Sequence, residues 1–257
     1  MKKFAIITGA SNGIGKSFTE TFAQDGINLV LVARSLDKLQ SIKKDLEKKY
    51  GIEVVVIEKD LSQPTAAQEV YAFTQAKKIK IEYLVNNAWF GDYGAFADSD
   101  NEKNIQMLQL NIITLTSLTR YYLEDMKKHN VGKILNVGST AGFQPGPYMA
   151  IYFASKAYVQ NFSLALANEL ENTKITVTTL CPWPTQSNFE KHAKAEGSLL
   201  FAGKLPSSDS VARLGYQNMM NGKKLVVHGR MNALKAYSIR LLPMYIVLKM
   251  MNFIMKK

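Results

Sequence analysis

The chain has 257 residues, of which 47% are apolar and 21% charged, a composition that excludes a disordered or fibrous protein. Its net charge is +11, and the excess lies at the C-terminal end, because no acidic residue follows Asp209 whereas nine basic residues do. The single cysteine, Cys181, excludes an intramolecular disulfide, and no apolar run reaches the roughly 18 residues of a membrane-spanning helix. We therefore expect one cytoplasmic domain over residues 1–257, without a signal peptide.

Apolar periodicity predicts strands and helices that alternate along the chain. A strand at residues 3–8 leads through a glycine-rich turn into an amphipathic helix at 14–25, and a strand at 27–33 leads into a helical pattern from Leu36 to Leu46. Further strands are predicted at 54–57, 83–86, 133–137, 175–180 and 224–227. This alternation predicts an α/β fold, a doubly wound, Rossmann-type parallel sheet with helices on both faces. Loops that follow strands, at 89–100, 142–147 and 183–206, are expected to frame a ligand site.

The glycine-rich turn at residues 8–15 reads TGASNGIG and lies between a strand and a helix, where backbone amides can approach a phosphate. The alternative for such a motif alone is a tight turn without a ligand. A nucleoside-triphosphate P-loop is disfavoured, because Ala10 stands where that motif needs its first glycine. We expect the turn to bind a dinucleotide through Gly9, Ser11, Asn12, Gly13, Ile14 and Gly15.

The second strand ends in Ala33-Arg34, at the position where NAD-binding folds commonly carry an acidic residue. Arg34 can pair with a 2′-phosphate, which favours NADPH over NADH as the cofactor. A solvated arginine at a helix start is the alternative.

Tyr152 and Lys156 are four residues apart in a helical pattern, so both side chains project from one face. A neighbouring ammonium stabilises a phenolate and lowers the tyrosine pKa, which makes Tyr152 a candidate acid. Ser139, after the strand at 133–137, can donate to a substrate carbonyl. Asn111 lies in a preceding helical stretch and could hold a water near Lys156, although a structural asparagine fits the local sequence equally. These four are the predicted catalytic residues.

Together these motifs resemble the short-chain dehydrogenase/reductase family over residues 1–230. The resemblance rests on TGASNGIG, Asp60-Leu61, NNA at 86–88, Asn111, Ser139, YFASK at 152–156 and Pro182. It implies a seven-stranded sheet in the order 3-2-1-4-5-6-7, a homodimer or homotetramer, and no metal. It also implies hydride transfer between a nicotinamide and a carbonyl carbon, with Tyr152 as proton donor and Ser139 as carbonyl polariser.

The same resemblance assigns further cofactor contacts. Asp60, with Leu61 beside it, would lie at the adenine, and Asn87 would border the ribose. The nicotinamide ribose would bind Tyr152 and Lys156, and the carboxamide would meet Thr185 and Ser187.

Two positions depart from the family pattern: Trp89 and Trp183, the only tryptophans, stand where the family usually has glycine. Indoles there add bulk beside the cofactor and put its affinity in question. Natural drift with local repacking and deliberate engineering of the pocket wall both explain the change, and the identity of the two replacements slightly favours engineering. We hypothesise that the indoles narrow or cap the substrate cleft.

Residues 232–257 form a tail that is apolar and basic together, in which Pro243 predicts two short helices rather than one. Packing on the body or across a subunit contact is favoured over a lid or a peripheral contact with an anionic membrane. Nucleic-acid binding is not expected, since no basic-aromatic reading module is present.

Aromatic residues expected near the site, Trp89, Phe143, Tyr148 and Phe189, predict a lipophilic carbonyl substrate. The sequence thus predicts an NADPH-dependent carbonyl reductase. The alternative is a non-catalytic dinucleotide-binding sensor or scaffold with the same fold, in which the tryptophans block turnover.

Overall fold

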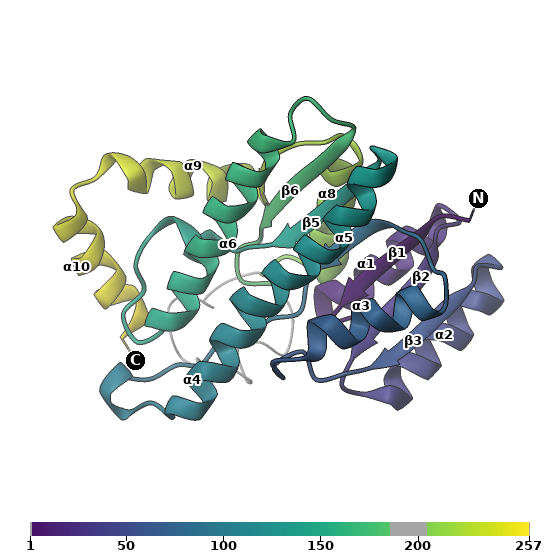
Figure 1. The fold of residues 1–257 in the computed structure, drawn as a ribbon. Helices are drawn as coiled ribbons and strands as arrows, with labels where there is room; N and C mark the ends of the chain where they lie inside the picture. The colour runs from purple at the N-terminus through teal and green to yellow at the C-terminus, as the bar shows by residue number, and fades with distance from the viewer. Residues whose placement is uncertain (1, 186–204, 257) are drawn as a thin grey trace.

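The computed structural model describes residues 2–185 and 205–256. Within them, seven parallel strands form one sheet in the order β3-β2-β1-β4-β5-β6-β7 (Figure 1). The predicted fold class and strand order are confirmed, and each predicted strand is within two residues of the observed bounds. Those bounds are β1 (Phe4–Thr8), β2 (Asn28–Ala33), β3 (Val54–Glu58), β4 (Ile81–Asn86), β5 (Gly132–Val137), β6 (Ile175–Cys181) and β7 (Leu225–Val227).

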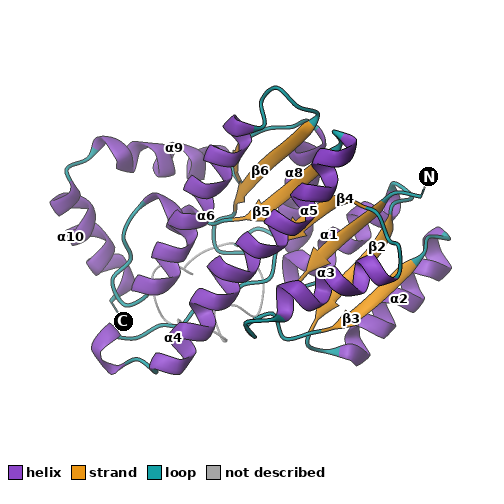
Figure 2. Cartoon of the chain, viewed as in Figure 1, coloured by secondary structure: helices purple, strands orange, loops and turns teal. Residues whose placement is uncertain are grey.

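Helices cover both faces of the sheet (Figure 2). One layer consists of α1 (Gly13–Gln24), α2 (Leu36–Tyr50) and α8 (Ser208–Met220), and the other of α3 (Ala66–Ala76), α5 (Leu115–His129) and α6 (Ala150–Glu169). Strand β1 shows why both are needed: Ala5 and Ile7 pack in the first core, whereas Phe4 and Ile6 pack in the second. A parallel strand buried on two faces needs such a continuous apolar run.

A chain of buried amides and hydroxyls ties β4 and β5 to α6. The Asn86 Nδ2 donates to Asn136 Oδ1 at 2.9 Å, and the Asn136 Nδ2 donates to Ser163 Oγ at 2.9 Å. Buried polar groups require such partners. These contacts fix the lateral position of the helix that carries Tyr152 and Lys156.

Asn111 lies in a π-helical segment, η2 (Gln109–Thr114), between α4 (Asn101–Leu108) and α5. The sequence pattern predicts an ordinary helical stretch here, because the local residues carry no sign of the wider turn. Short π-helical turns are rare and frequent at functional sites.

The tail folds as α9 (Arg230–Ser238), the 3₁₀ turn η5 (Ile239–Leu241) and α10 (Met244–Met255). Pro243 is the N-cap of α10, so the predicted break into two short helices is confirmed. One stripe of α10 packs on the body: Val247, Met251 and Met255 share a core with Met149, Tyr152 and Phe153. Among the helices of residues 2–185 and 205–256, none combines the length and the apolar character that crossing a bilayer requires.

Candidate active site

The glycine-rich turn between β1 and α1 adopts a shape that only glycine allows at two positions. Gly9 has a φ of +67°, and a Cβ there would lie 2.9 Å from Asn87 Nδ2. A Cβ on Gly15 would lie 2.1 Å from the Gly9 carbonyl oxygen. The backbone therefore passes closer to its neighbours than any other residue permits.

The start of α1 is open to an anion. The Asn12 side chain makes no capping hydrogen bond in the described structure, and the first turn holds no acidic residue. The first N–H groups of a helix otherwise need an acceptor, and the helix dipole favours a negative one. Ser11 is half-buried and Asn12 exposed beside these groups. The turn thus fits the diphosphate of a dinucleotide.

Thr8 and Asn87 fasten this turn to the end of β4. The backbone N–H groups of Asn87 and Ala88 each donate to Thr8 Oγ1 at 2.9 Å. The Asn87 side chain donates from Nδ2 to the Thr8 carbonyl, also at 2.9 Å. Asn87, predicted to border a ribose, therefore also holds the turn and the β4 loop together. Its local sequence gives no sign of this second role.

Arg34 and Asp60 lie just beyond the carboxyl ends of β2 and β3. Burial raises the pKa of the Asp60 carboxyl, but hydrogen bonds from Ser62 and the positive charge of Arg34 outweigh it and lower the pKa. Arg34 is exposed and can meet a ligand. Leu61 contributes to the core, and its carbonyl accepts from Thr114 Oγ1 at 2.8 Å; its predicted contact with the cofactor stays a prediction.

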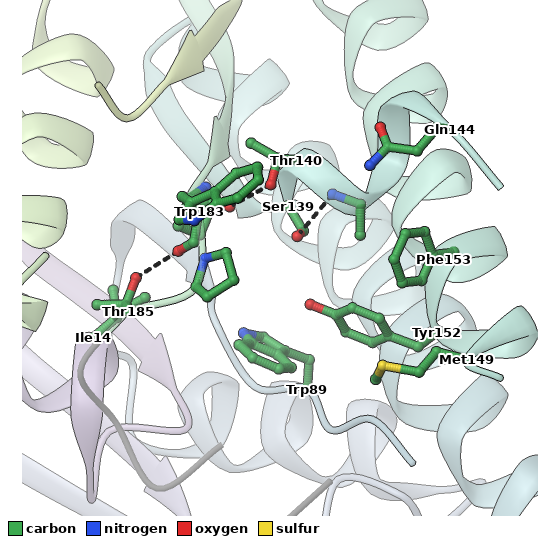
Figure 3. A pocket seen from close by; sticks show the side chains of 13 residues that line it. Ile14, Trp89, Ser139, Thr140, Gln144, Met149, Tyr152, Phe153, Trp183 and Thr185 are labelled. Carbon is green, nitrogen blue, oxygen red and sulfur yellow. Dashed lines mark hydrogen bonds between the residues drawn. The ribbon is translucent and has the colours of Figure 1, made fainter. Parts of the chain in front are cut away.

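Ser139 and Tyr152 line the same pocket. Figure 3 shows the Tyr152 hydroxyl directed towards Ser139, and the two side chains form a hydrogen bond. Ser139 follows β5, and its Oγ accepts from the Ala141 amide at 3.1 Å.

Ile14 and Thr185, predicted cofactor contacts, line the same pocket. Ser187 and Phe189 lie outside the described residues.

Lys156 is buried behind Tyr152 and is 1% exposed. Its Nζ donates to the Val137 carbonyl at 2.9 Å and lies 4.6 Å from the centroid of the Trp89 ring. The same Nζ is 5.8 Å from the centroid of the Tyr152 ring. The ammonium is therefore held between the end of β5 and the indole of the β4 loop, an arrangement that stabilises a cation.

Burial dominates the proton affinities of this pair. Desolvation raises the Tyr152 pKa, despite the hydrogen bond with Ser139, and it lowers the Lys156 pKa to about 7. The sequence pattern predicts that the ammonium lowers the tyrosine pKa, whereas in the structure desolvation is the larger effect and the pKa is raised. A phenol kept protonated in this way is still suited to donate a proton.

Asn111 supports the loop that carries Trp89. Its Nδ2 donates to the Phe90 carbonyl at 2.9 Å and to Ser155 Oγ at 3.1 Å, and its Oδ1 accepts from the Phe90 amide at 3.2 Å. The amide thus joins the β4 loop to α6, next to Lys156. Its predicted role as holder of a water relay stays a prediction.

Both tryptophans line the pocket (Figure 3). The Trp89 ring centroid is 5.7 Å from that of Tyr152, and the Trp183 carbonyl accepts from Thr185 Oγ1 at 2.7 Å.

Sequence reasoning missed Gln144, Met149 and Phe153, which also line the pocket. Two sequence signals could have identified them. Gln144 lies in the loop at 142–147 that is expected to frame the site, and Met149 and Phe153 are close to Tyr152 in the sequence.

Two other aromatic residues expected near the site do not line this pocket. Phe143 packs in a separate small core with Cys181 and Ala236, and Tyr148 stacks on Tyr93.

The buried lysine makes the free energy of unfolding depend on pH. The pKa of Lys156 in the folded protein, about 7, lies below the 10.5 of a solvated lysine. Below about pH 7 the cost of burying the charge is therefore fully present, and this cost fades as the pH rises towards about 10. We expect wild type to gain stability relative to Lys156→Met over that interval, as measured by urea unfolding. The exposed Lys16→Met control should show a constant difference from wild type, and a constant difference for Lys156→Met would contradict the assignment.

Comparison with known proteins agrees with this geometry. A family model described as short chain dehydrogenase matches residues 3–197. The 7beta-hydroxysteroid dehydrogenase of Collinsella aerofaciens is 31% identical over 186 residues, which cover 70% of each chain. The very-long-chain 3-oxoacyl-CoA reductase of Anas platyrhynchos is 31% identical over 230 residues, 85% of this chain and 71% of that protein.

A solved structure is similar over nearly the whole fold. The short-chain dehydrogenase of Sphingobium yanoikuyae in complex with NADPH superposes with a TM-score of 0.82 and 28% identity, covering 93% of this chain and 94% of that one. The glycine-rich turn, the Ser139-Tyr152 pocket and these matches lead to one conclusion. The chain belongs to the short-chain dehydrogenase/reductase family of oxidoreductases, which use a nicotinamide dinucleotide to interconvert alcohol and carbonyl groups.

Proposed function

We propose that the protein reduces a lipophilic ketone or aldehyde to an alcohol with NADPH. The observation that carries this proposal is the convergence of the Ser139 and Tyr152 hydroxyls on one pocket whose other walls are largely apolar. The same pocket reaches Ile14 at the start of α1, so a dinucleotide held by the glycine-rich turn can extend into it.

A nicotinamide dinucleotide supplies the hydride when it is bound. Ser139 Oγ donates a hydrogen bond to the substrate carbonyl oxygen and polarises it. Tyr152, kept protonated by burial, transfers its proton to that oxygen as negative charge develops there. Lys156, when protonated, stabilises the phenolate that remains. The Val137 carbonyl and the Trp89 ring hold its ammonium in place.

The pocket walls favour a substrate with a large apolar body. The lining includes the apolar residues Trp89, Met149, Phe153, Pro182 and Trp183, and apolar walls select lipophilic ligands. Two relatives are named for a hydroxysteroid and a very-long-chain 3-oxoacyl-CoA. Gln144 Oε1 has no hydrogen-bond partner among the described residues, so it offers an acceptor to a second polar group of the substrate.

NADPH is proposed because Arg34 is exposed after β2, at the place where the resemblance puts the adenine ribose. The similar structure from Sphingobium yanoikuyae contains NADPH, which supports this choice. A homodimer or homotetramer and a cytoplasmic location stay predictions from the sequence.

Tyr152→Phe tests the proton donor. We expect kcat for ketone reduction to fall by roughly a thousandfold, because the proton donor is lost while the ring remains. Cofactor oxidation is followed by NADPH absorbance over a panel of ketones, and NADPH binding is titrated separately. Tyr158→Phe, six residues further along α6 and partly exposed, is the matched control and should keep full activity.

Two outcomes would count against this mechanism. Undiminished turnover by Tyr152→Phe would exclude Tyr152 as the donor. NADPH binding by wild type without turnover on any ketone would favour the non-catalytic sensor.

Arg34→Asp tests the cofactor choice. The aspartate would repel a 2′-phosphate and accept from a free ribose hydroxyl, so the ratio of kcat/KM for NADPH over NADH should fall by roughly 10- to 100-fold. Lys48→Asp, in the last turn of α2, makes the same charge change away from the site and should leave the ratio unaltered. An unaltered ratio in Arg34→Asp would refute the 2′-phosphate contact.

Trp89→Gly combined with Trp183→Gly tests whether the indoles restrict the pocket. Removing both should shift the ranking of kcat/KM towards bulkier ketones and change NADPH affinity, because both rings line the pocket and Trp89 also covers Lys156. Trp89→Phe with Trp183→Phe keeps most of the bulk and serves as the control. Unchanged affinity and unchanged substrate ranking in the double glycine variant would refute the hypothesis.

A further inference from the structure

The last three helical elements expose an unusual number of large apolar side chains. Leu241 is 86% exposed and Phe253 is 74% exposed. We call this set the C-terminal apolar face: Met231, Leu234, Tyr237, Leu241, Leu242, Met244, Tyr245, Leu248, Met250 and Phe253. Surface apolar residues scattered singly are ordinary, but a set concentrated within one short segment of the chain, residues 231–253, indicates an interaction surface.

Helix α10 shows the anomaly most clearly. Ten of its twelve residues are apolar, and Lys249 and Asn252 are the exceptions. Only the stripe of Val247, Met251 and Met255 is buried on the body. A helix that packs on a protein through one stripe usually has a polar opposite side. The opposite side of α10 is therefore suited to an apolar environment outside the folded chain.

The charges around this face identify the partner. Arg230, Lys235, Arg240, Lys249 and Lys256 are all exposed, and no acidic residue occurs after Asp209. A second copy docked through the same face would present the same cations and no acidic residue of this segment to balance them, which is repulsive. A bilayer with anionic headgroups supplies both the apolar depth and the opposite charge.

We propose that the C-terminal apolar face docks on the surface of an anionic membrane. Helices α9 and α10 lie in the interface, with the apolar side chains among the acyl chains and the cations at the headgroups. The twelve residues of α10 are too few to span a bilayer, which needs about 20. Figure 1 shows both helices extending to one side of the molecule, away from the sheet.

The docking face is continuous with the pocket wall. The buried stripe of α10 packs with Tyr152, and the Tyr93 hydroxyl donates to the Met255 carbonyl at 2.6 Å. Lys235 Nζ lies 5.9 Å from the Trp183 ring centroid, and Arg240 lies 5.2 Å from that of Phe143. A docked protein would thus hold its pocket beside the bilayer, where a lipophilic carbonyl compound dissolves.

Vesicle flotation tests the proposal with the full-length protein and without cofactor or substrate, so its result is independent of the proposed enzyme activity. Wild type should float with vesicles of phosphatidylcholine and phosphatidylglycerol and remain behind with pure phosphatidylcholine. Binding should weaken as salt is raised. No binding to the anionic vesicles would overturn the proposal.

Two variants separate the apolar and electrostatic contributions. Leu241→Ser with Phe253→Ser and, separately, Lys249→Glu with Lys256→Glu should each lower the vesicle partition coefficient by about tenfold or more. The control is Ile113→Ser with Val131→Ser, which removes partly exposed apolar groups outside the tail. Circular dichroism melts verify that every variant is folded.

Three results would contradict membrane docking. Loss of binding in the charge variant alone would indicate a general polyanion site. Equal loss in the control pair would indicate non-specific adsorption. A wild-type dimer in sedimentation that Leu241→Ser with Phe253→Ser converts to a monomer would identify a second copy as the occupant.

Discussion

The buried ammonium of Lys156 is the constraint on which the site depends. A charge removed from water is costly unless polar or aromatic groups surround it. Here the Val137 carbonyl at the end of β5 and the Trp89 ring after β4 meet the lysine of α6. One side chain therefore aligns three elements of the fold, and Asn111 reinforces the junction by holding Phe90 beside α6. The Tyr152 hydroxyl reaches Ser139 within this frame.

The elements that sequence reasoning predicted well are those set by local chemistry. Short apolar runs predict the strands. The glycine-rich motif predicts the tight turn, in which Gly9 and Gly15 leave no room for a Cβ. The strand order, in contrast, came from the family resemblance. The π-helical turn at Asn111 and the packing of Trp89 on Lys156 depend on contacts between distant segments, which residue patterns do not encode. The same holds for the pKa of Tyr152, because neighbour charge is visible in the sequence and desolvation is not.

The C-terminal tail has one side packed on the body of the protein and another side exposed. Sequence alone favoured packing on the body or a subunit contact over a membrane contact. In the structure, one stripe of α10 completes the core around Met149 and Phe153, while most of its remaining apolar residues stay uncovered. The buried stripe supports the pocket wall, and the uncovered side is what the membrane proposal explains.

The two indoles have a practical meaning beyond their bulk. The chain contains no other tryptophan, and both residues line the pocket that contains Ser139 and Tyr152. When the protein is excited at the long-wavelength edge of its absorption band, where tryptophan absorbs and tyrosine does not, the fluorescence therefore originates at the site itself. A molecule that enters alters the polarity around these fluorophores or quenches them, so occupancy can be read from unlabelled protein.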